Sequence, residues 1–294
     1  MTDQHTLQDP SQPSGQPEGQ KQQHPGRERD LTPQADHGEA SYRGSGKLTG
    51  RRALITGGDS GIGRAVAIAF AREGADVVLS YLEAEEEDGQ ETARLVREAG
   101  RTAVLAPGDI TDEEHCQALV QRTVDELGGI DLLVNNAAYQ MAQEGIAAIT
   151  TEQFDRVLKT NVYAMFWLCR AAVPLMQPGS TIINTSSVQA YQPSPELLDY
   201  ATTKAAIVNF TRGLAQELAP KGIRVNTVAP GPIWTPLIPS TMPEDVVDDF
   251  GGETALGRVG QPAELAPAFV FLASAESSYI TGERIGVHGG MPLP

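Results

Sequence analysis

Cysteine, long apolar runs and clustered positive charge are all scarce in this chain. Cys116 and Cys169 are the two cysteines among 294 residues, too few for a disulfide framework and without the paired spacing of a zinc site. We expect both to be reduced, packed thiols. No pair of the five histidines has metal-ligand spacing either, so no metal site is predicted.

The same scarcity limits the partners of the protein. No apolar run reaches the roughly eighteen residues that a membrane span needs, and the N-terminus lacks the basic start and apolar stretch of a secretion signal. The formal net charge of -16 at pH 7 argues against nucleic acid, because no cluster of Lys and Arg offsets it. We therefore expect a soluble, cytoplasmic protein with no membrane and no nucleic-acid partner.

Residues 1–47 have few large apolar side chains and are rich in Gln, Pro, Gly, Ser and charge. Such a segment cannot bury enough apolar surface to fold alone. The chain thus divides into an irregular N-terminal arm, residues 1–47, and one folded domain, residues 48–294. We expect roughly the first 25 residues to be a dispensable tail, whereas Leu31 to Lys47 is also compatible with an extension across a neighbouring subunit.

From Leu48 onward, short apolar runs alternate with helical stretches, as in a doubly wound α/β domain with a parallel sheet. Ile62 to Glu73 indicates the first helix, which Gly74 ends as a C-terminal cap. Single α/β domains of about 250 residues are common, so one domain accommodates this segment. Seven strands are expected, over Ala53–Thr56, Asp76–Ser80, Thr102–Ala106, Asp131–Asn135, Thr181–Thr185, Arg224–Ala229 and Arg284–His288.

A glycine-rich turn, Thr-Gly-Gly-Asp-Ser-Gly-Ile-Gly from Thr56 to Gly63, joins the first expected strand to the first helix. Turns and helix caps also collect glycine, but strand, turn and helix in this order are typical of a dinucleotide site. Gly57 lets the strand turn tightly, Gly61 lets backbone amides approach a pyrophosphate, and Gly63 lets the helix pack close on the sheet. The motif predicts a nicotinamide dinucleotide held at the helix N-terminus.

Tyr200 and Lys204 are four residues apart in a pattern of helical period, so their side chains share one helix face. An ammonium beside the phenol lowers the phenol pKa from its usual value of about 10, which suits proton transfer near neutral pH. A lone pair of this kind is more often a packing pair. Ser187, thirteen positions before Tyr200 at the end of an expected strand, adds a hydroxyl that can polarise a carbonyl.

The glycine turn, Asn135-Asn136-Ala137-Ala138, Asn161, Ser187, Tyr200, Lys204 and Pro230-Gly231 together resemble the short-chain dehydrogenase/reductase family, in order and spacing, over about residues 48–294. Within that family the chain is similar to a bacterial subgroup of NAD(P)-dependent aldehyde reductase-like oxidoreductases with an N-terminal extension. Ala138 departs from the family pattern, which has glycine there. The resemblance implies a Rossmann-like fold, a homotetramer, and hydride transfer between a nicotinamide and a carbonyl or alcohol.

The resemblance also assigns catalytic roles. Tyr200 is implied as proton donor and acceptor, Lys204 as a partner of the tyrosine and of the nicotinamide ribose, and Ser187 as the group that positions the substrate carbonyl. Asn161 is implied as the residue whose backbone anchors a water that relays protons. Ser186 competes with Ser187, but its spacing to Tyr200 is one residue too long for the family.

Cofactor preference is not indicated. Tyr81 occupies the position where NAD enzymes of this family place Asp, and Ser60 and Leu82 stand where NADP enzymes carry Arg or Lys, so we predict use of both, written NAD(P). The acidic run Glu83 to Asp88 is interpreted as a solvated helix start, and Asp109 either holds adenine or forms an Asx turn. The predicted cofactor-binding residues are Gly57, Asp59, Ser60, Gly61, Ile62, Gly63, Ser80, Tyr81, Asp109, Ile110, Asn136, Ala137, Tyr200, Lys204, Pro230, Gly231, Ile233 and Thr235.

Residues Gly231 to Gly260 have few periodic signals and several prolines, which favours a mobile flap over the substrate. Trp234 of this flap, with Gln189 and Tyr191, is predicted to line a substrate pocket that suits aldehydes, ketones or sugars, although the latter two are also compatible with packing. The alternative function is a non-catalytic NAD(P)-binding sensor or assembly protein, against which the intact catalytic set argues. A dehydratase or epimerase is disfavoured by the glycine spacing.

Overall fold

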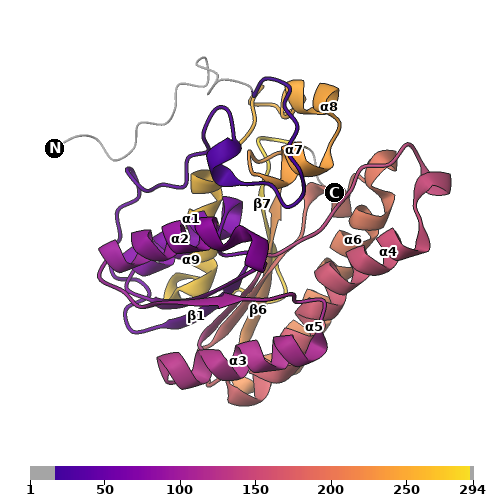
Figure 1. Ribbon diagram of the computed structural model, residues 1–294. Coiled ribbons are helices and arrows are strands. Elements are labelled where there is room, and N and C mark those ends of the chain that lie inside the picture. The colour runs from indigo at the N-terminus through magenta and orange to yellow at the C-terminus, as the bar shows by residue number, and fades with distance from the viewer. Residues whose placement is uncertain (1–16, 292–294) are drawn as a thin grey trace.

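Seven parallel strands form one sheet in the order β3-β2-β1-β4-β5-β6-β7 (Figure 1). The computed structural model describes residues 17–291. The chain reverses its direction of winding between β1 and β4, where open sheets of this kind bind ligands. The doubly wound, Rossmann-like fold is confirmed, and each strand bound lies within one residue of its prediction. The strands are β1 (Arg52–Thr56), β2 (Asp76–Tyr81), β3 (Ala103–Pro107), β4 (Leu132–Asn135), β5 (Thr181–Thr185), β6 (Arg224–Pro230) and β7 (Arg284–Val287).

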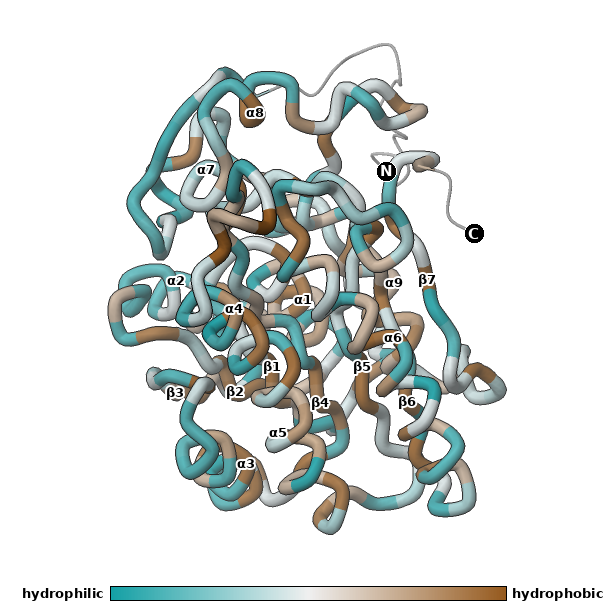
Figure 2. Tube along the Cα trace, turned by 90° about the vertical axis from the view of Figure 1, so that its right-hand side faces the viewer, coloured by the Kyte–Doolittle hydropathy of each residue, from teal (hydrophilic) through white to brown (hydrophobic). Residues whose placement is uncertain are grey.

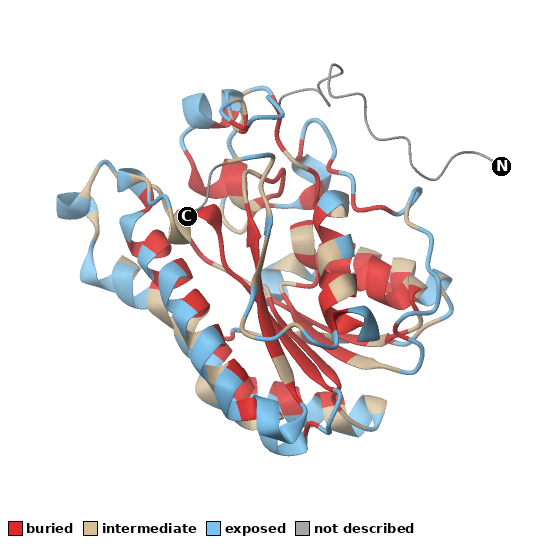
Figure 3. Cartoon of the chain, turned by 180° about the vertical axis from the view of Figure 1, so that it is seen from behind, coloured by how far each residue is buried: buried red, intermediate tan, exposed pale blue. Residues whose placement is uncertain are grey.

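Helices cover both faces of the sheet, so its central strands are buried (Figure 3), whereas the edge strands β3 and β7 are only partly buried. One apolar cluster joins the sheet to α1 and α9, and a second joins it to α3, α5 and α6. The central strands, such as β1, β4 and β5, are among the apolar parts of the trace in Figure 2, as expected of parallel strands covered on two sides. The helices are α1 (Gly61–Arg72), α2 (Glu86–Glu98), α3 (Glu113–Leu127), α4 (Thr151–Leu158), α5 (Ala164–Ala172), α6 (Leu198–Leu218), α7 (Leu237–Thr241), α8 (Glu244–Asp248) and α9 (Pro262–Ala273).

Cys116 and Cys169 are buried, free thiols, as predicted. Within residues 17–291, no cluster of three His, Cys, Asp or Glu side chains has the arrangement of a metal site. The helices in that part of the chain are also too short or too polar to cross a bilayer.

The N-terminal arm folds back over its own domain (Figure 1). Its residues 19–26 run beside α7 and α8. There the backbone N–H of Gln22 donates to the Pro239 carbonyl at 2.9 Å, and Lys21 Nζ donates to the Met242 carbonyl at 2.9 Å. We expected a tail up to about residue 25, but from residue 17 onward this segment is paired with the domain. The earlier part of the expected tail lies outside the described residues.

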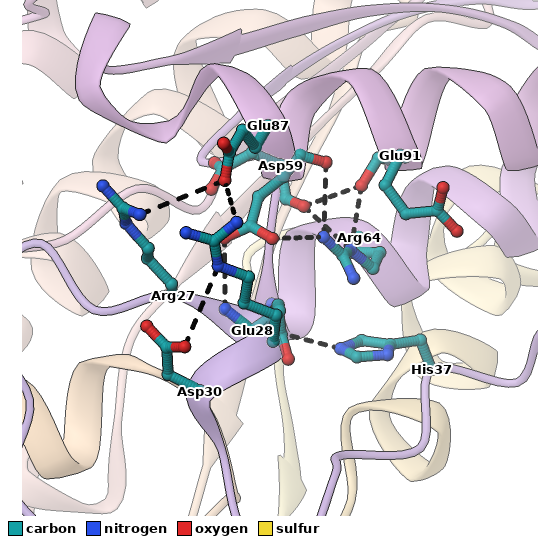
Figure 4. A network of polar contacts seen from close by, with 12 residues as sticks. Arg27, Glu28, Asp30, His37, Asp59, Arg64, Glu87 and Glu91 are labelled. Carbon is teal, nitrogen blue, oxygen red and sulfur yellow. Dashed lines mark hydrogen bonds and ion pairs between the residues drawn. The ribbon is translucent and has the colours of Figure 1, made fainter.

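A buried carboxylate anchors the arm to the first helix (Figure 4). Glu28 accepts the N–H of Gly61 at the start of α1 and lies 2.9 Å from Nε2 of His37. Burial, the largest effect, raises the pKa of Glu28, but His37, Arg64 and the Gly61 amide together outweigh it and hold that pKa below its usual range. An ionised carboxylate at a helix N-terminus is stabilising, so Glu28 caps α1 from the arm side.

The rest of the arm packs along α1 and the flap. Leu31 is buried with Trp234 in a small apolar cluster, and the indole N–H of Trp234 donates to the Pro33 carbonyl at 2.7 Å. At the other end of α1, Arg72 donates to the Tyr42 carbonyl at 2.7 Å. Leu31 to Lys47 therefore packs against the domain of its own chain.

Docking of the arm should weaken in alkali. Burial lowers the pKa of His37, but hydrogen bonds to Glu28 and Glu39 outweigh it and raise this pKa to about 9 from the ordinary 6.5. A pKa raised by folding contributes stability that is complete below the ordinary value and is lost as the pH rises through about 9. Proteolysis within the arm is therefore expected to accelerate between about pH 7 and about pH 10.

His37→Gln is the control for this prediction, because it keeps a polar side chain that does not titrate. Its cleavage rate should change little with pH once the intrinsic pH dependence of the protease, measured on an unfolded substrate, is divided out. A wild-type arm that is cleaved at the same corrected rate across this range would contradict the role of the Glu28–His37 pair.

Candidate active site

A cleft of about 700 Å³ opens at the carboxyl ends of the strands on both sides of the β1–β4 crossover. It is lined by all of the predicted cofactor-binding residues except Gly63, and by Ser187, Tyr200, Lys204 and Gln189 of the predicted catalytic and substrate sets. Segments far apart in the sequence are thus brought to the place where this type of sheet binds ligands.

The turn after β1 can be formed only with glycine at its key positions. Gly57 and Gly61 have φ angles of +60° and +47°, in the left-handed region. A Cβ on Gly63 would lie 1.7 Å from the Gly57 carbonyl oxygen, so Gly63 acts by contact with the turn and not by lining the cleft. Asn136 holds the same turn from the end of β4, with Nδ2 3.2 Å from the carbonyl oxygens of Thr56 and Gly57.

The N-terminus of α1 faces the cleft at Ser60, Gly61 and Ile62. The first amides of a helix lack partners within the helix and favour an anion. The arm occupies the Gly61 amide through Glu28. The expected pyrophosphate site is therefore limited to the part of this helix end that Glu28 leaves open, at Ser60 and Ile62.

The end of β2 supplies a second feature that fits a dinucleotide. Ser80 Oγ and Asp59 Oδ2 are buried polar atoms without a hydrogen-bond partner in the described part of the chain, and both residues line the cleft. Burial and then the charge of Glu85 raise the pKa of Asp59 well above its usual range. Ribose hydroxyls are the groups that such atoms bind.

The acidic run Glu83 to Asp88, which leads into the first turn of α2, is not simply solvated. Glu85 lines the cleft, and Asp88 is 8% exposed with its Oδ1 atom 3.1 Å from Arg64. The other Asp88 oxygen accepts the Glu28 amide at 3.1 Å. Our interpretation of this run as a solvated helix start is wrong for these two residues, because Arg64 and the arm draw Asp88 inward.

Tyr200 and Lys204 lie one turn apart near the start of α6, and both are buried. Lys204 Nζ is 5.2 Å from the centroid of the Tyr200 ring and donates to the Thr185 carbonyl at 2.9 Å. The hydroxyl of Ser187 is hydrogen bonded to the Tyr200 side chain. Three of the four predicted catalytic residues therefore meet in the cleft.

The electrostatics of this cluster differ from our expectation. Burial raises the pKa of Tyr200 to about 12, against the opposing effect of the hydrogen bond with Ser187. Burial also lowers the pKa of Lys204 to about 7, so this amine is only partly charged near neutral pH and offers the phenol little stabilising charge. The phenol of Tyr200 is consequently protonated at neutral pH and can donate its proton.

Asn161 lies behind the cleft in a π-helical turn, Lys159–Tyr163, between α4 and α5. Such turns are frequent at functional sites. Its side chain accepts the Tyr139 amide at 2.8 Å, and its Nδ2 donates to the Tyr139 carbonyl at 2.9 Å and to Thr203 Oγ1 at 3.0 Å. This side chain therefore ties the segment after β4 to the helix that carries Tyr200, while the proposed backbone role stays a prediction.

The structure bears on two alternatives of the sequence analysis. Ser186 and Ser187 both line the cleft, but the Ser186 hydroxyl donates to the Lys204 carbonyl at 2.9 Å, whereas the Ser187 hydroxyl is hydrogen bonded to the Tyr200 side chain. Asp109 lines the cleft and also forms an Asx turn, accepting the Thr111 amide at 2.8 Å.

Two of the predicted substrate residues do not line the cleft. The side chain of Trp234 is fully buried against the arm, and the ring of Tyr191 packs 4.2 Å from the guanidinium carbon of Arg284. Their contacts are used for packing, so we correct their prediction as substrate residues.

Sequence reasoning missed part of the cleft wall. His24, Pro25 and Gly26 of the arm line the cleft together with Tyr139 and Arg156. His24 and Arg156 are 132 residues apart in sequence and 3.5 Å apart in space. No local pattern marks this contact, since it depends on the arm folding back.

The chain matches the family model described as enoyl-(acyl carrier protein) reductase over residues 57–292. It is 56% identical over 275 residues to the uncharacterized oxidoreductase YghA of Escherichia coli, covering 93% of this chain and 94% of the relative. It is 48% identical over 280 residues to NADPH-dependent aldehyde reductase 1, chloroplastic, of Arabidopsis thaliana, covering 93% and 97%.

Solved structures agree with these relatives. A short chain dehydrogenase from Burkholderia cenocepacia in complex with NADP is similar with a TM-score of 0.78 and 33% identity, covering 83% of this chain and 98% of that one. The cleft geometry and these similarities lead to one conclusion: the chain is an oxidoreductase of the short-chain dehydrogenase/reductase family.

Proposed function

We propose that this oxidoreductase uses NAD(P) to interconvert a carbonyl group and an alcohol, with an aldehyde, ketone or sugar as substrate. The observation that carries the proposal is the meeting of Ser187, Tyr200 and Lys204 in the cleft that the glycine turn and Ser80 also line. The residues for proton transfer and the residues for dinucleotide binding thus line the same cleft.

When bound, the nicotinamide cofactor supplies or accepts the hydride. The start of α1 would hold the pyrophosphate of this cofactor, and Ser80 and Asp59 would hold ribose hydroxyls. In reduction, Ser187 hydrogen bonds to the substrate oxygen and Tyr200 donates its phenolic proton to that oxygen. Lys204, fixed by the Thr185 carbonyl, lies one helical turn behind the phenol and binds the nicotinamide ribose in this proposal.

Cofactor preference stays a prediction of dual use. Ser60, Tyr81 and Leu82 line the cleft but carry no positive charge, so none of them favours a 2′-phosphate. Glu85 lies in the same wall, but burial, its largest influence, raises its pKa, which reduces its repulsion of a phosphate. NADPH and NADH titrations followed by nicotinamide fluorescence would rank the two cofactors.

Oxidation of the alcohol should speed up steeply with pH. This direction needs Tyr200 as a base, and its pKa of about 12 leaves the phenolate scarce at neutral pH. The phenolate fraction rises about tenfold per pH unit below the pKa, so kcat/KM for oxidation should rise by up to that factor per unit until another step limits it. Reduction needs the protonated phenol, so kcat/KM for reduction should not change with the ionisation of Tyr200 over the same pH range. Stopped-flow pH profiles in both directions check this, and equal profiles would contradict it.

The direct test of the proposed function follows nicotinamide absorbance with NADH and with NADPH against a panel of aldehydes, ketones and sugars. Consumption with any member supports the reductase. Tight cofactor binding without turnover across the panel would favour the second candidate, an NAD(P)-binding sensor or assembly protein.

Assembly and location belong to the same proposal. The family resemblance implies a homotetramer, and the exposed apolar side chains Phe154, Tyr163 and Phe166, from α4 to α5, are compatible with contact between subunits. Sedimentation that shows only monomer would reject the homotetramer.

The cytoplasmic location also stays a prediction, which cell fractionation would check.

A further inference from the structure

We propose that Arg156 selects carbonyl substrates that carry a carboxylate or phosphate away from the carbonyl, and that the N-terminal arm holds Arg156 in place through His24. The inference rests on the proposed carbonyl reductase function and goes beyond it by naming the substrate class.

Arg156 is held by two aromatic side chains at the cleft wall. Its guanidinium carbon lies 4.1 Å from the centroid of the Tyr139 ring, and its Nη2 atom lies 3.5 Å from His24 Nε2. The rings of His24 and Tyr139 meet edge to face, with centroids 5.1 Å apart. Stacking occupies a face of the guanidinium and fixes its plane. The N–H groups at its edge are the donors that match a carboxylate or phosphate.

No acidic side chain neutralises Arg156. Its helix neighbour Asp155 pairs with Lys159 at 2.8 Å, and in residues 17–291 no carboxylate lies within ion-pair distance of Arg156. Burial, and then the charge of Arg156, lower the pKa of His24, so the imidazole is neutral near pH 7 and can accept from Arg156. A charged guanidinium with one weak polar contact therefore borders the cleft.

The position of Arg156 points to the substrate and not to the cofactor phosphates. Tyr139, on which it stacks, is bonded through Asn161 to Thr203, which precedes Lys204 on the helix that carries Tyr200. The expected ribose site lies at the end of β2, on the other side of β1 from β4, and the expected phosphate site lies at the start of α1, directly after β1. Arg156 is thus at the catalytic end of the cleft.

The remaining charges of the cleft give Arg156 an orienting role. Among the described lining residues, the only Lys and Arg are Lys204, which is bonded to the Thr185 carbonyl, and Arg156. Acidic side chains also line this part of the cleft: Asp245, Asp249 and Glu253 belong to the flap, and Glu196 lies just before α6. Like charges repel, so an anionic substrate end is accepted beside Arg156 and disfavoured beside these carboxylates.

The arm makes this arrangement possible. His24 belongs to the segment whose Lys21 and Gln22 are bonded to the Met242 and Pro239 carbonyls of the flap. His24 is accordingly a positioning residue that acts through Arg156. The arm and flap are held together over the substrate end of the cleft.

The test compares two probes of the same shape, para-carboxybenzaldehyde, which is an anion, and para-nitrobenzaldehyde, which is neutral. In the full-length protein, Arg156→Ala should lower the ratio of kcat/KM for the anionic over the neutral aldehyde by about ten- to a hundredfold, mainly through KM. Comparing ratios removes the different intrinsic reactivities of the two aldehydes. Arg156→Lys, which keeps charge but not the planar fork, should restore part of the ratio.

Two further variants distinguish charge selection by Arg156 from a general effect on activity. His24→Ala should lower the same ratio by a smaller factor, since the arginine remains but is less well held. Arg94→Ala is the matched control, because Arg94 is an exposed arginine of α2 paired with Glu91 and Glu98 and outside the cleft. It should leave the ratio unchanged. Equal loss of both aldehydes in Arg156→Ala would overturn the proposal.

Equilibrium binding keeps the inference testable without turnover. Calorimetry with the Tyr200→Phe protein saturated with NADH would give the Kd of each probe, and adding Arg156→Ala should weaken only the anionic one, by the same factor. If the wild-type protein reduces neither aldehyde, the proposed reductase function loses support while these Kd values still decide the role of Arg156. An unchanged Kd for the anionic probe would overturn the inference.

Discussion

Tyr200→Phe is expected to lower kcat/KM for carbonyl reduction by about 10²- to 10⁴-fold, the usual contribution of a positioned proton donor. The phenyl ring keeps the packing of Tyr200 and its position beside Lys204. Only the hydroxyl that meets Ser187 is lost. The measurement is steady-state reduction followed by nicotinamide absorbance, together with an NADH titration, in which the Kd should change by less than about twofold.

Tyr279→Phe is the matched control, because Tyr279 is fully exposed and the same hydroxyl is removed there. It should leave kcat/KM unchanged. Full activity of Tyr200→Phe would contradict the assignment of the proton donor, and loss of NADH binding in that variant would show that the tyrosine acts through the structure of the cleft.

Gly63→Ala should weaken cofactor binding strongly. The new Cβ would lie 1.7 Å from the Gly57 carbonyl oxygen and 2.9 Å from Asn136 Nδ2, so either the turn or α1 must move. Overpacking of this kind costs about 1–3 kcal/mol and sometimes more. We expect at least roughly tenfold weaker NADH binding in fluorescence titrations, because the displaced turn forms the pyrophosphate site, and a lower Tm in thermal unfolding.

Gly213→Ala provides the comparison. Gly213 lies inside α6, is exposed, and would place its Cβ with no atom within 4 Å. Alanine is preferred to glycine inside a helix by about 0.5–1 kcal/mol, so this variant should gain slightly in stability and bind NADH normally. Normal cofactor binding by Gly63→Ala would mean that the tight contact at the turn is not needed for the site.

The sheet was predictable because its strands are covered on both faces. A strand such as Ala53 to Thr56 is then a short apolar run between polar turns, and its bounds can be identified without knowing its neighbours. The cofactor wall was predictable for a related reason. Gly57 and Gly61 lie in left-handed backbone conformations, which restrict the residue type strongly enough to leave a motif.

The arm and the substrate end were not predictable, since their contacts join segments far apart in sequence. Glu28 is one acid in a polar segment, and its burial against Gly61 follows only from the folded position of the arm. For the same reason Trp234 was assigned to substrate when it packs on Pro33. The raised pKa of Tyr200 could not be predicted from the sequence either, because it depends on burial that the spacing to Lys204 does not reveal.

Hydride transfer itself is tested most directly with NADH that carries deuterium at the reactive nicotinamide position. The wild-type protein is incubated with this cofactor and with an aldehyde that it reduces, and the alcohol is analysed by mass spectrometry. The proposed reaction predicts one deuterium on the former carbonyl carbon with one of the two cofactor epimers, and product formation at least about a hundredfold slower with Tyr200→Phe. An alcohol that carries no deuterium with either epimer would contradict the proposed reaction.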